Sequence, residues 1–246
     1  MSKLKLGFGL FVIFTTQWIH AEEYQVGFAV AKPPFVYAMQ PGASSENRGI
    51  ELEIIHAAFA EEDITFTPHY FWRDKLIDEL IRKSVDAVSG VRAGNDKLFY
   101  SDSTVYFQNY AITHMTAKPI NSFQELAGRK VVAWGGAAAD LGTAFQAVIP
   151  KMTKFTEIID QKNQVENFLN GSFDTIVIDA HIFKYYSLKH GVDPNHFSYN
   201  HIFGERTEFV TGFRDEALRD RFNTGLKKIK SNGDYDKIFH NHFDNK

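Results

Sequence analysis

The 246-residue chain contains no cysteine, which excludes disulfide bonds, thiolate metal sites and thiol nucleophiles together. It also lacks an excess of positive charge, because 27 Lys and Arg residues stand against 30 Asp and Glu residues, for a formal net charge of −3. A chain with this balance has no overall attraction for nucleic acid or for anionic lipid. We therefore expect no nucleic-acid partner, and any function must reside in a local site.

Apolar runs long enough to cross a membrane are missing as well. The N-terminal run at residues 6–14 is shorter than the roughly 20 residues that a membrane-spanning helix needs. Lys3 and Lys5 precede this run, and a short polar stretch leads from it to Ala21, an order typical of a secretory signal peptide. An N-terminal anchor helix is the alternative. We expect a signal peptide at residues 1–21 and export to the periplasm, without a lipid anchor because no cysteine follows Ala21.

Hydrophobic residues nevertheless make up 44% of the chain, which is enough for a folded core. Segments with strand-like and helix-like spacing of apolar residues alternate along the sequence. Strands are predicted at residues 24–30, 64–70, 85–91, 130–134, 154–159 and 173–178. Helices are predicted at residues 50–61, 72–83, 122–128, 138–148, 161–169, 180–190, 218–229 and 235–243. This alternation predicts an α/β fold with largely parallel sheets.

One sequence pattern occurs twice. A helix followed by Ser-Val-Asp-Ala-Val-Ser-Gly at residues 84–90 is matched by a helix followed by Ser-Phe-Asp-Thr-Ile-Val-Ile-Asp at residues 172–179. Two such units predict two lobes of the same build. Because ligands of open α/β sheets bind beyond the carboxyl ends of the strands, two facing lobes would share one cleft.

A series of short motifs follows these elements along the chain. The motifs are Pro33-Pro34-Phe35-Val36-Tyr37, Gly49-Ile50-Glu51-Leu52-Glu53-Ile54, Trp72 with Asp86-Ala87-Val88, Tyr100-Ser101 with Tyr106, and residues 131–138, 171–179 and 231–243. The series resembles that of family 3 of the extracellular solute-binding proteins, the periplasmic amino-acid-binding components of ABC transporters. The resemblance spans nearly the whole chain after residue 21.

The resemblance implies a fold of the periplasmic binding protein-like type II class, with two α/β lobes around a cleft and a two-strand hinge. Lobe 1 would contain residues 22–110 and 206–246, and lobe 2 would contain residues 111–205. The implied function is capture of a small polar ligand, an amino acid or a related compound, for an inner-membrane ABC permease. We expect a monomer that is not an enzyme and needs neither a cofactor nor a metal.

The resemblance also implies two charged ligand contacts. Asp179 ends the last second-lobe strand and is expected to bind the ammonium group of the ligand, its alternative role being to cap the following helix. Arg92 lies in the segment where the family has carboxylate-binding Thr and Arg residues, and this segment is shortened here. Arg92 is therefore expected either to bind a ligand carboxylate or to be a surface arginine in a shortened loop.

The remaining expected contacts are aromatic residues and small residues at positions that match the family's cleft. The aromatic residues are Phe35, Tyr37, Trp72 and Trp134, which would either stack on the ligand or pack in the core. The small residues are Gly90, Gly136 and Ala137. The last two replace part of a Gly-Thr-Thr motif, so only backbone N–H groups at that helix start would be left to bind an anion.

Other chemistry finds less support in the sequence. His240 and His242 lie near Asp244, but residues two apart on a helix point in different directions, which disfavours a metal site.

Two alternatives on the same fold stay open. One is a ligand-sensing subunit for a membrane sensor. The other is an enzyme similar to cyclohexadienyl dehydratases, in which Asp179 or Glu51 would be the general acid or base.

Overall fold

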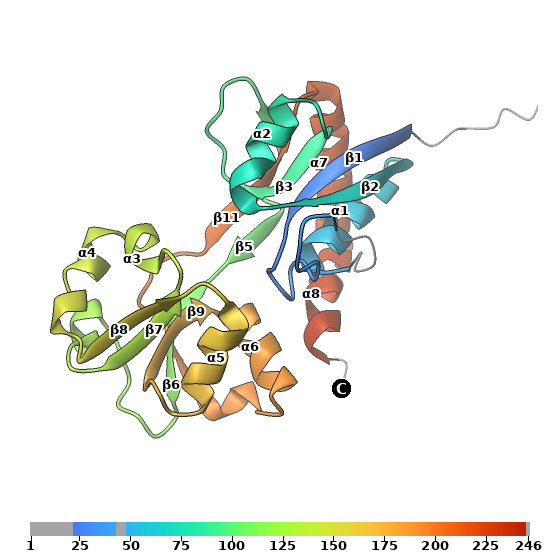
Figure 1. Ribbon diagram of the computed structural model, residues 1–246. Helices are drawn as coiled ribbons and strands as arrows, with labels where there is room; N and C mark the ends of the chain where they lie inside the picture. Colours follow the sequence, from blue (N-terminus) through green and yellow to red (C-terminus); the bar gives the residue numbers. More distant parts are fainter. Residues whose placement is uncertain (1–21, 43–47, 245–246) are drawn as a thin grey trace, which may run out of the picture.

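The computed structural model describes residues 22–42 and 48–244, which form two β-sheets with helices packed on them (Figure 1). The expected signal peptide lies outside the described residues. One sheet has the strand order β2-β1-β3-β11-β4, with β5 paired to β11, and the other has the order β10-β6-β9-β7-β8. We call the first sheet with its helices the first lobe and the second sheet with its helices the second lobe.

The strands of the first lobe are β1 (Glu22–Ala29), β2 (Ile64–Phe71), β3 (Ala87–Val91), β4 (Phe99–Tyr100), β5 (Val105–Phe107) and β11 (Thr207–Phe213). Its helices are α1 (Ile50–Ala60), α2 (Leu76–Ile81), α7 (Glu216–Ser231) and α8 (Asp234–Asp244). The strands of the second lobe are β6 (Asn109–His114), β7 (Lys130–Trp134), β8 (Lys154–Ile158), β9 (Thr175–Asp179) and β10 (Phe197–Asn200). Its helices are α3 (Ala137–Asp140), α4 (Gly142–Gln146), α5 (Gln161–Leu169) and α6 (Ala180–Lys189). Among the described residues, none of these helices has the length and apolar character needed to cross a membrane.

The two lobes share one topology, as the repeated sequence pattern predicts. In the first lobe, β1 pairs in parallel with β2 and β3, and β11 runs antiparallel to β3. In the second lobe, β7 pairs in parallel with β8 and β9, and β6 runs antiparallel to β9. In both lobes, the aspartate of the repeated pattern accepts a backbone N–H from the neighbouring parallel strand. Asp86 Oδ2 accepts the N–H of Gln25 at 2.9 Å, and Asp174 Oδ2 accepts the N–H of Lys130 at 3.0 Å.

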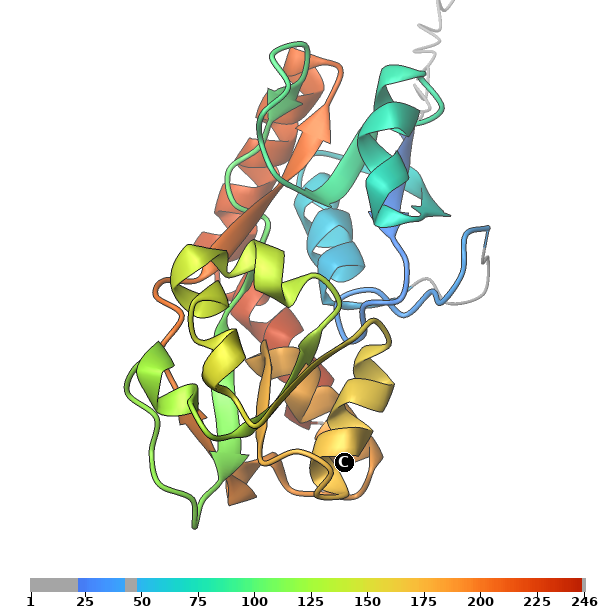
Figure 2. The same cartoon turned by 60° about the vertical axis from the view of Figure 1, so that its left-hand side comes forward.

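The chain crosses between the lobes at two places that lie side by side (Figure 2). It leaves the first lobe after β5 and returns at β11, and these two strands are hydrogen-bonded in antiparallel register, with Phe107 opposite Thr207. The expected lobe boundary after residue 110 falls within β6, and the expected boundary before residue 206 falls just ahead of β11. The mixed α/β architecture with a two-strand connection confirms the predicted fold class. The expectation of largely parallel sheets is wrong, because five of the nine strand pairings among the described residues are antiparallel.

Some predicted elements differ from the observed ones. The helix expected at residues 138–148 is divided into α3 and α4, because Gly142, the first residue of α4, has a left-handed φ of 79° that interrupts a continuous helix. The helix expected from Ser122 is a 3₁₀ turn at Phe123–Leu126, and the Ser122 side chain does not cap it. The strands β4, β5, β6, β10 and β11 were not predicted from apolar spacing, although the resemblance implied a pair of crossing strands.

The core of the first lobe holds the hinge strand β11 against α1 and α7. Phe59 of α1 packs on Phe222 of α7 with ring centroids 5.1 Å apart, and both rings are fully buried. Gly225 brings the backbone of α7 so close to the Ala58 carbonyl of α1 that a methyl group at this position would clash with it. Close packing of this kind gives the hinge a rigid base on the side of the first lobe.

Candidate functional site

A cavity of about 260 Å³ lies between the two lobes, at the carboxyl ends of the parallel strands. The first lobe lines it with residues 29–32 after β1, Arg73 after β2 and Arg92 after β3. The second lobe lines it with residues at the ends of β7, α3, β8 and β9. These residues are Trp134, Gly135, Asp140, Leu141, Ile159, Gln161, Asp179 and Ile182. Hinge residues Phe107, Asn109, Thr207 and Phe209 complete the lining. This is where the topology of two facing α/β lobes predicts a ligand site.

Asp179 lies at this cavity with a side chain only 3% exposed. Its Oδ1 accepts the N–H groups of His181 at 2.8 Å and Ile182 at 3.1 Å, in the first turn of α6. Its Oδ2 accepts the N–H of Gln108, between β5 and β6, at 2.8 Å. The carboxylate therefore caps α6 and ties the hinge to the second lobe while it also borders the cavity. Its contact with a ligand ammonium group stays a prediction.

Arg92 lies in the cavity together with Arg73, which the sequence interpretation did not single out. The guanidinium carbons of Arg73 and Arg92 are 5.3 Å and 5.5 Å from the centroid of the same Phe209 ring. Phe209 belongs to hinge strand β11 and is buried. Within the described part of the chain, neither guanidinium has an ion-pair partner, so both are available to a ligand. Arg73 directly follows Trp72, so its position next to an expected cleft residue was the signal available in the sequence.

Lys32 brings a third cation to the cavity, and a buried acid offsets its charge. The ammonium group lies 3.0 Å from Glu51 Oε2 and 4.9 Å from the centroid of the Phe107 ring. Glu51 is fully buried at the start of α1. Gly90 packs on this carboxylate, because a Cβ at Gly90 would lie 2.6 Å from Glu51 Oε1. Gly90 therefore makes room for the buried acid and is not part of the cavity lining.

Of the four expected aromatic contacts, only Trp134 lines the cavity. Trp72 is 54% exposed and lies outside it. Phe35 is fully buried and packs on the Phe107 ring at a centroid distance of 4.4 Å, so it contacts hinge strand β5 and not the cavity. Tyr37 lines a different cavity.

The expected anion site at the start of α3 is occupied by a side chain of the protein itself. Glu157 accepts the N–H of Gly136 at 3.1 Å and the N–H of Ala138 at 2.7 Å through its two carboxylate oxygens. Ala137 is fully buried between them. Neither Gly136 nor Ala137 lines the cavity, and their ligand contacts stay predictions.

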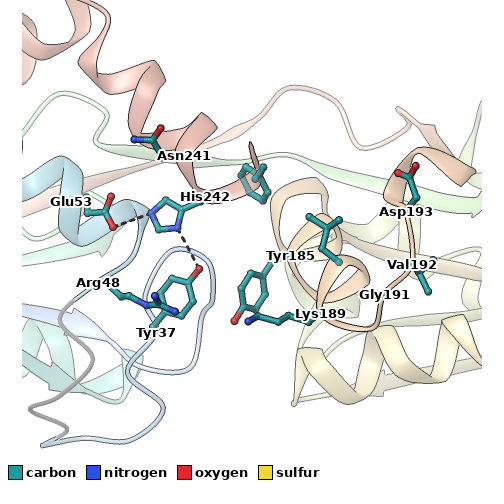
Figure 3. A pocket seen from close by; sticks show the side chains of 12 residues that line it. Tyr37, Arg48, Glu53, Tyr185, Lys189, Gly191, Val192, Asp193, Asn241 and His242 are labelled. Carbon is teal, nitrogen blue, oxygen red and sulfur yellow. Dashed lines mark hydrogen bonds and ion pairs between the residues drawn. The ribbon is translucent and has the colours of Figure 1, made fainter. Parts of the chain in front are cut away.

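The second cavity, of about 640 Å³, lies where α8 and the loop before α1 meet α6 (Figure 3). His242 stands between Glu53 and Tyr37, with Nε2 3.0 Å from Glu53 Oε1 and Nδ1 3.4 Å from the Tyr37 hydroxyl. Burial raises the pKa of Tyr37 to about 12. The Tyr37 ring meets Tyr185 of the second lobe edge to face at 5.5 Å. This cluster therefore joins the lobes at their rim, and His242, considered above for a metal, is engaged by an acid and a phenol.

Comparison with known proteins places the chain in one family. The sequence profile of the bacterial extracellular solute-binding proteins, family 3, matches residues 24–245. The chain is 28% identical to the arginine-binding periplasmic protein of Mannheimia haemolytica, over 84% of this chain and 85% of that protein. It is 25% identical to ABC transporter arginine-binding protein 1 of Escherichia coli, over 97% of each chain.

Solved structures agree with this assignment at the level of the fold. An ancestral cationic amino acid solute-binding protein superimposes with a TM-score of 0.73 at 20% identity, covering 90% of this chain and 95% of that chain. The second substrate-binding domain of Lactococcus lactis GlnP in its open conformation superimposes with a TM-score of 0.67 at 18% identity, covering 92% and 97%. The chain belongs to family 3 of the bacterial extracellular solute-binding proteins.

Proposed function

We propose that this protein captures an amino acid, or a closely related compound, in the periplasm and presents it to an ABC permease in the inner membrane. The observation that carries the proposal is the cavity between the lobes, which both lobes line with charged side chains at their strand ends. The connection through β5 and β11 allows the lobes to move as two bodies about a narrow hinge. A ligand that touches both lobes favours the closed arrangement, because it gains contacts there that the open arrangement lacks.

The family and the two relatives named above support the transport role. Both relatives are named as arginine-binding proteins, one as periplasmic and the other as part of an ABC transporter. The proposed periplasmic location also rests on the signal-peptide pattern at residues 1–21. The two acids considered for acid–base catalysis are already engaged, Glu51 by Lys32 and Asp179 by three backbone N–H groups, which favours binding over turnover.

Thermal unfolding of the purified protein with each of a set of amino acids tests the proposal. A bound ligand at 100 times its dissociation constant stabilises the folded protein by about 2.7 kcal/mol, which raises the melting temperature by several degrees. If no amino acid and no related amine or carboxylate raises the melting temperature, the proposal is wrong.

Tryptophan fluorescence locates the bound ligand in the cleft. Trp134 lines the cavity and Trp72 does not, so binding is expected to change the emission of Trp134. Trp134→Phe should lose this change, and the matched variant Trp72→Phe should keep it. A signal that persists in Trp134→Phe would place the ligand elsewhere.

A further inference from the structure

We infer that the ligand of this cleft is an acidic amino acid, carrying two carboxylate groups and one ammonium group, and not a cationic amino acid. The inference rests on the proposed function and names the ligand class for the same cavity. It starts from the charges on the two walls. The first lobe presents Lys32, Arg73 and Arg92, and the second lobe presents Asp140 and Asp179.

Two of these five side chains already have partners within the protein. The ammonium group of Lys32 lies 3.0 Å from the carboxylate of Glu51, which is fully buried and has no other ion-pair partner among the described residues. The carboxylate of Asp179 receives three backbone N–H groups, two of them at the positive end of the α6 dipole. Among the described residues, the charged side chains of the cavity that have neither an ion-pair nor a hydrogen-bond partner are therefore Arg73 and Arg92 on one wall and Asp140 on the other.

The two arginines share one aromatic neighbour at the hinge. Both guanidinium groups lie over the same Phe209 ring, at 5.3 Å and 5.5 Å from its centroid. Both arginines also line the same cavity, so one ligand can reach both of them. Each guanidinium offers a planar fork of donors that fits one carboxylate. Two forks in one cavity therefore suit a ligand with two carboxylates better than a ligand with one.

The opposite wall suits a single ammonium group. Asp140 is exposed at the end of α3 and Asp179 borders the cavity at the end of β9. An acidic amino acid can direct its carboxylates to Arg73 and Arg92 and its ammonium group to this wall. The guanidinium or ammonium side chain of a cationic amino acid would add a third positive charge near the two arginines, with one uncompensated acid to balance them. The inferred ligand is therefore negatively charged, whereas the two relatives are named for arginine, which is positively charged.

Titration calorimetry with L-glutamate, L-aspartate, L-glutamine, L-arginine and L-lysine tests the inference. We expect glutamate or aspartate to bind at least tenfold more tightly than glutamine, arginine and lysine. Arg73→Gln should weaken binding of the acidic amino acid at least tenfold and change glutamine binding by less than threefold. The matched control is Arg82→Gln, which removes an exposed arginine outside both cavities and should leave all affinities unchanged.

The outcomes separate the inference from the proposed function. Tighter binding of arginine or lysine than of glutamate and aspartate would overturn the inference and leave the amino-acid-binding function in place. Equal affinities for glutamate and glutamine, or an Arg73→Gln variant that binds glutamate normally, would also overturn it. Failure of every amino acid to bind would contradict the proposed function itself.

Discussion

Replacing Asp179 by alanine measures how far one carboxylate holds the second lobe and its hinge together. The change removes the cap of α6, which costs about 0.5–2 kcal/mol for a typical N-cap aspartate. It also leaves the half-buried N–H of Gln108 without its acceptor, and an unsatisfied donor costs up to about 1–3 kcal/mol when it is fully buried. We therefore expect the free energy of unfolding to fall by about 1.5–5 kcal/mol in total.

The assay is urea unfolding followed by circular dichroism without ligand. Asp160→Ala is the matched control, because Asp160 caps α5 through one hydrogen bond, to the N–H of Asn163 at 3.2 Å, at an exposed position. This control should cost about 1 kcal/mol. Asp179→Asn keeps one oxygen for the α6 N–H groups and should fall between the two. If Asp179→Ala costs no more than Asp160→Ala, the assignment of a structural role to this carboxylate is wrong.

Three further changes test packing, the buried ion pair and the rim cluster. Gly225→Ala forces α7 away from α1 and should lower the free energy of unfolding by about 2 kcal/mol or more, measured by urea unfolding. Lys32→Met leaves a buried carboxylate uncompensated and should cost about 3–5 kcal/mol, most of which the double variant with Glu51→Gln should recover. Burial alone would raise the pKa of Glu53, but the hydrogen bond and charge of His242, the N–H of Gly49 and the charge of Arg48 together lower the pKa below its ordinary value of 4.5. Because the folded-state pKa is the lower one, this carboxylate stabilises the protein above pH 4.5, and the stabilisation is lost as the pH falls through the folded-state value. Urea unfolding from pH 6 to pH 3 should therefore show a smaller loss of stability for Glu53→Gln than for the unaltered protein.

The elements with a strong local signal could be predicted from the sequence. The predicted helix at residues 161–169 is observed as α5, and the one at residues 180–190 is observed as α6 with one residue fewer. An apolar stripe repeating every three to four residues, as at Leu218 and Phe222, identifies a helix such as α7 because the spacing fixes which face is buried. These elements carry their structural information within a short stretch of chain.

The antiparallel strands could not be predicted in this way, because their partners are far away in the sequence. β5 has three residues and pairs with β11, so that Val105 lies opposite Phe209. β4 has two residues and pairs with the same strand. A strand this short has no period to detect, and its stability comes from a neighbour about 100 residues away. The hinge was therefore implied only by the resemblance to a family.

Part of the candidate site could be predicted, because a strand end can be recognised in the sequence and strand ends meet at the cavity. Asp179, Arg92 and Trp134 end buried strands, and the topology of the fold brings strand ends to the cavity. Trp72 also follows a strand, but its ring is largely exposed, and the next residue, Arg73, lines the cavity instead. A difference of one residue after a strand end changes the direction of a side chain, and the sequence pattern alone does not define that direction.

The cations of the first lobe lie beside the hinge, and this position affects which ligands can close the cleft. Phe209 and Phe107 belong to the two hinge strands, and the cations of the first lobe lie over their rings. A ligand that contacts these cations alone binds the open and closed arrangements equally and cannot shift the balance between them. A ligand that also reaches Asp140 gains its second set of contacts only when the lobes approach. If the ligand is an acidic amino acid, as inferred above, closure requires both a carboxylate pair and an ammonium group, and a dicarboxylate without the ammonium group should bind without closing the cleft.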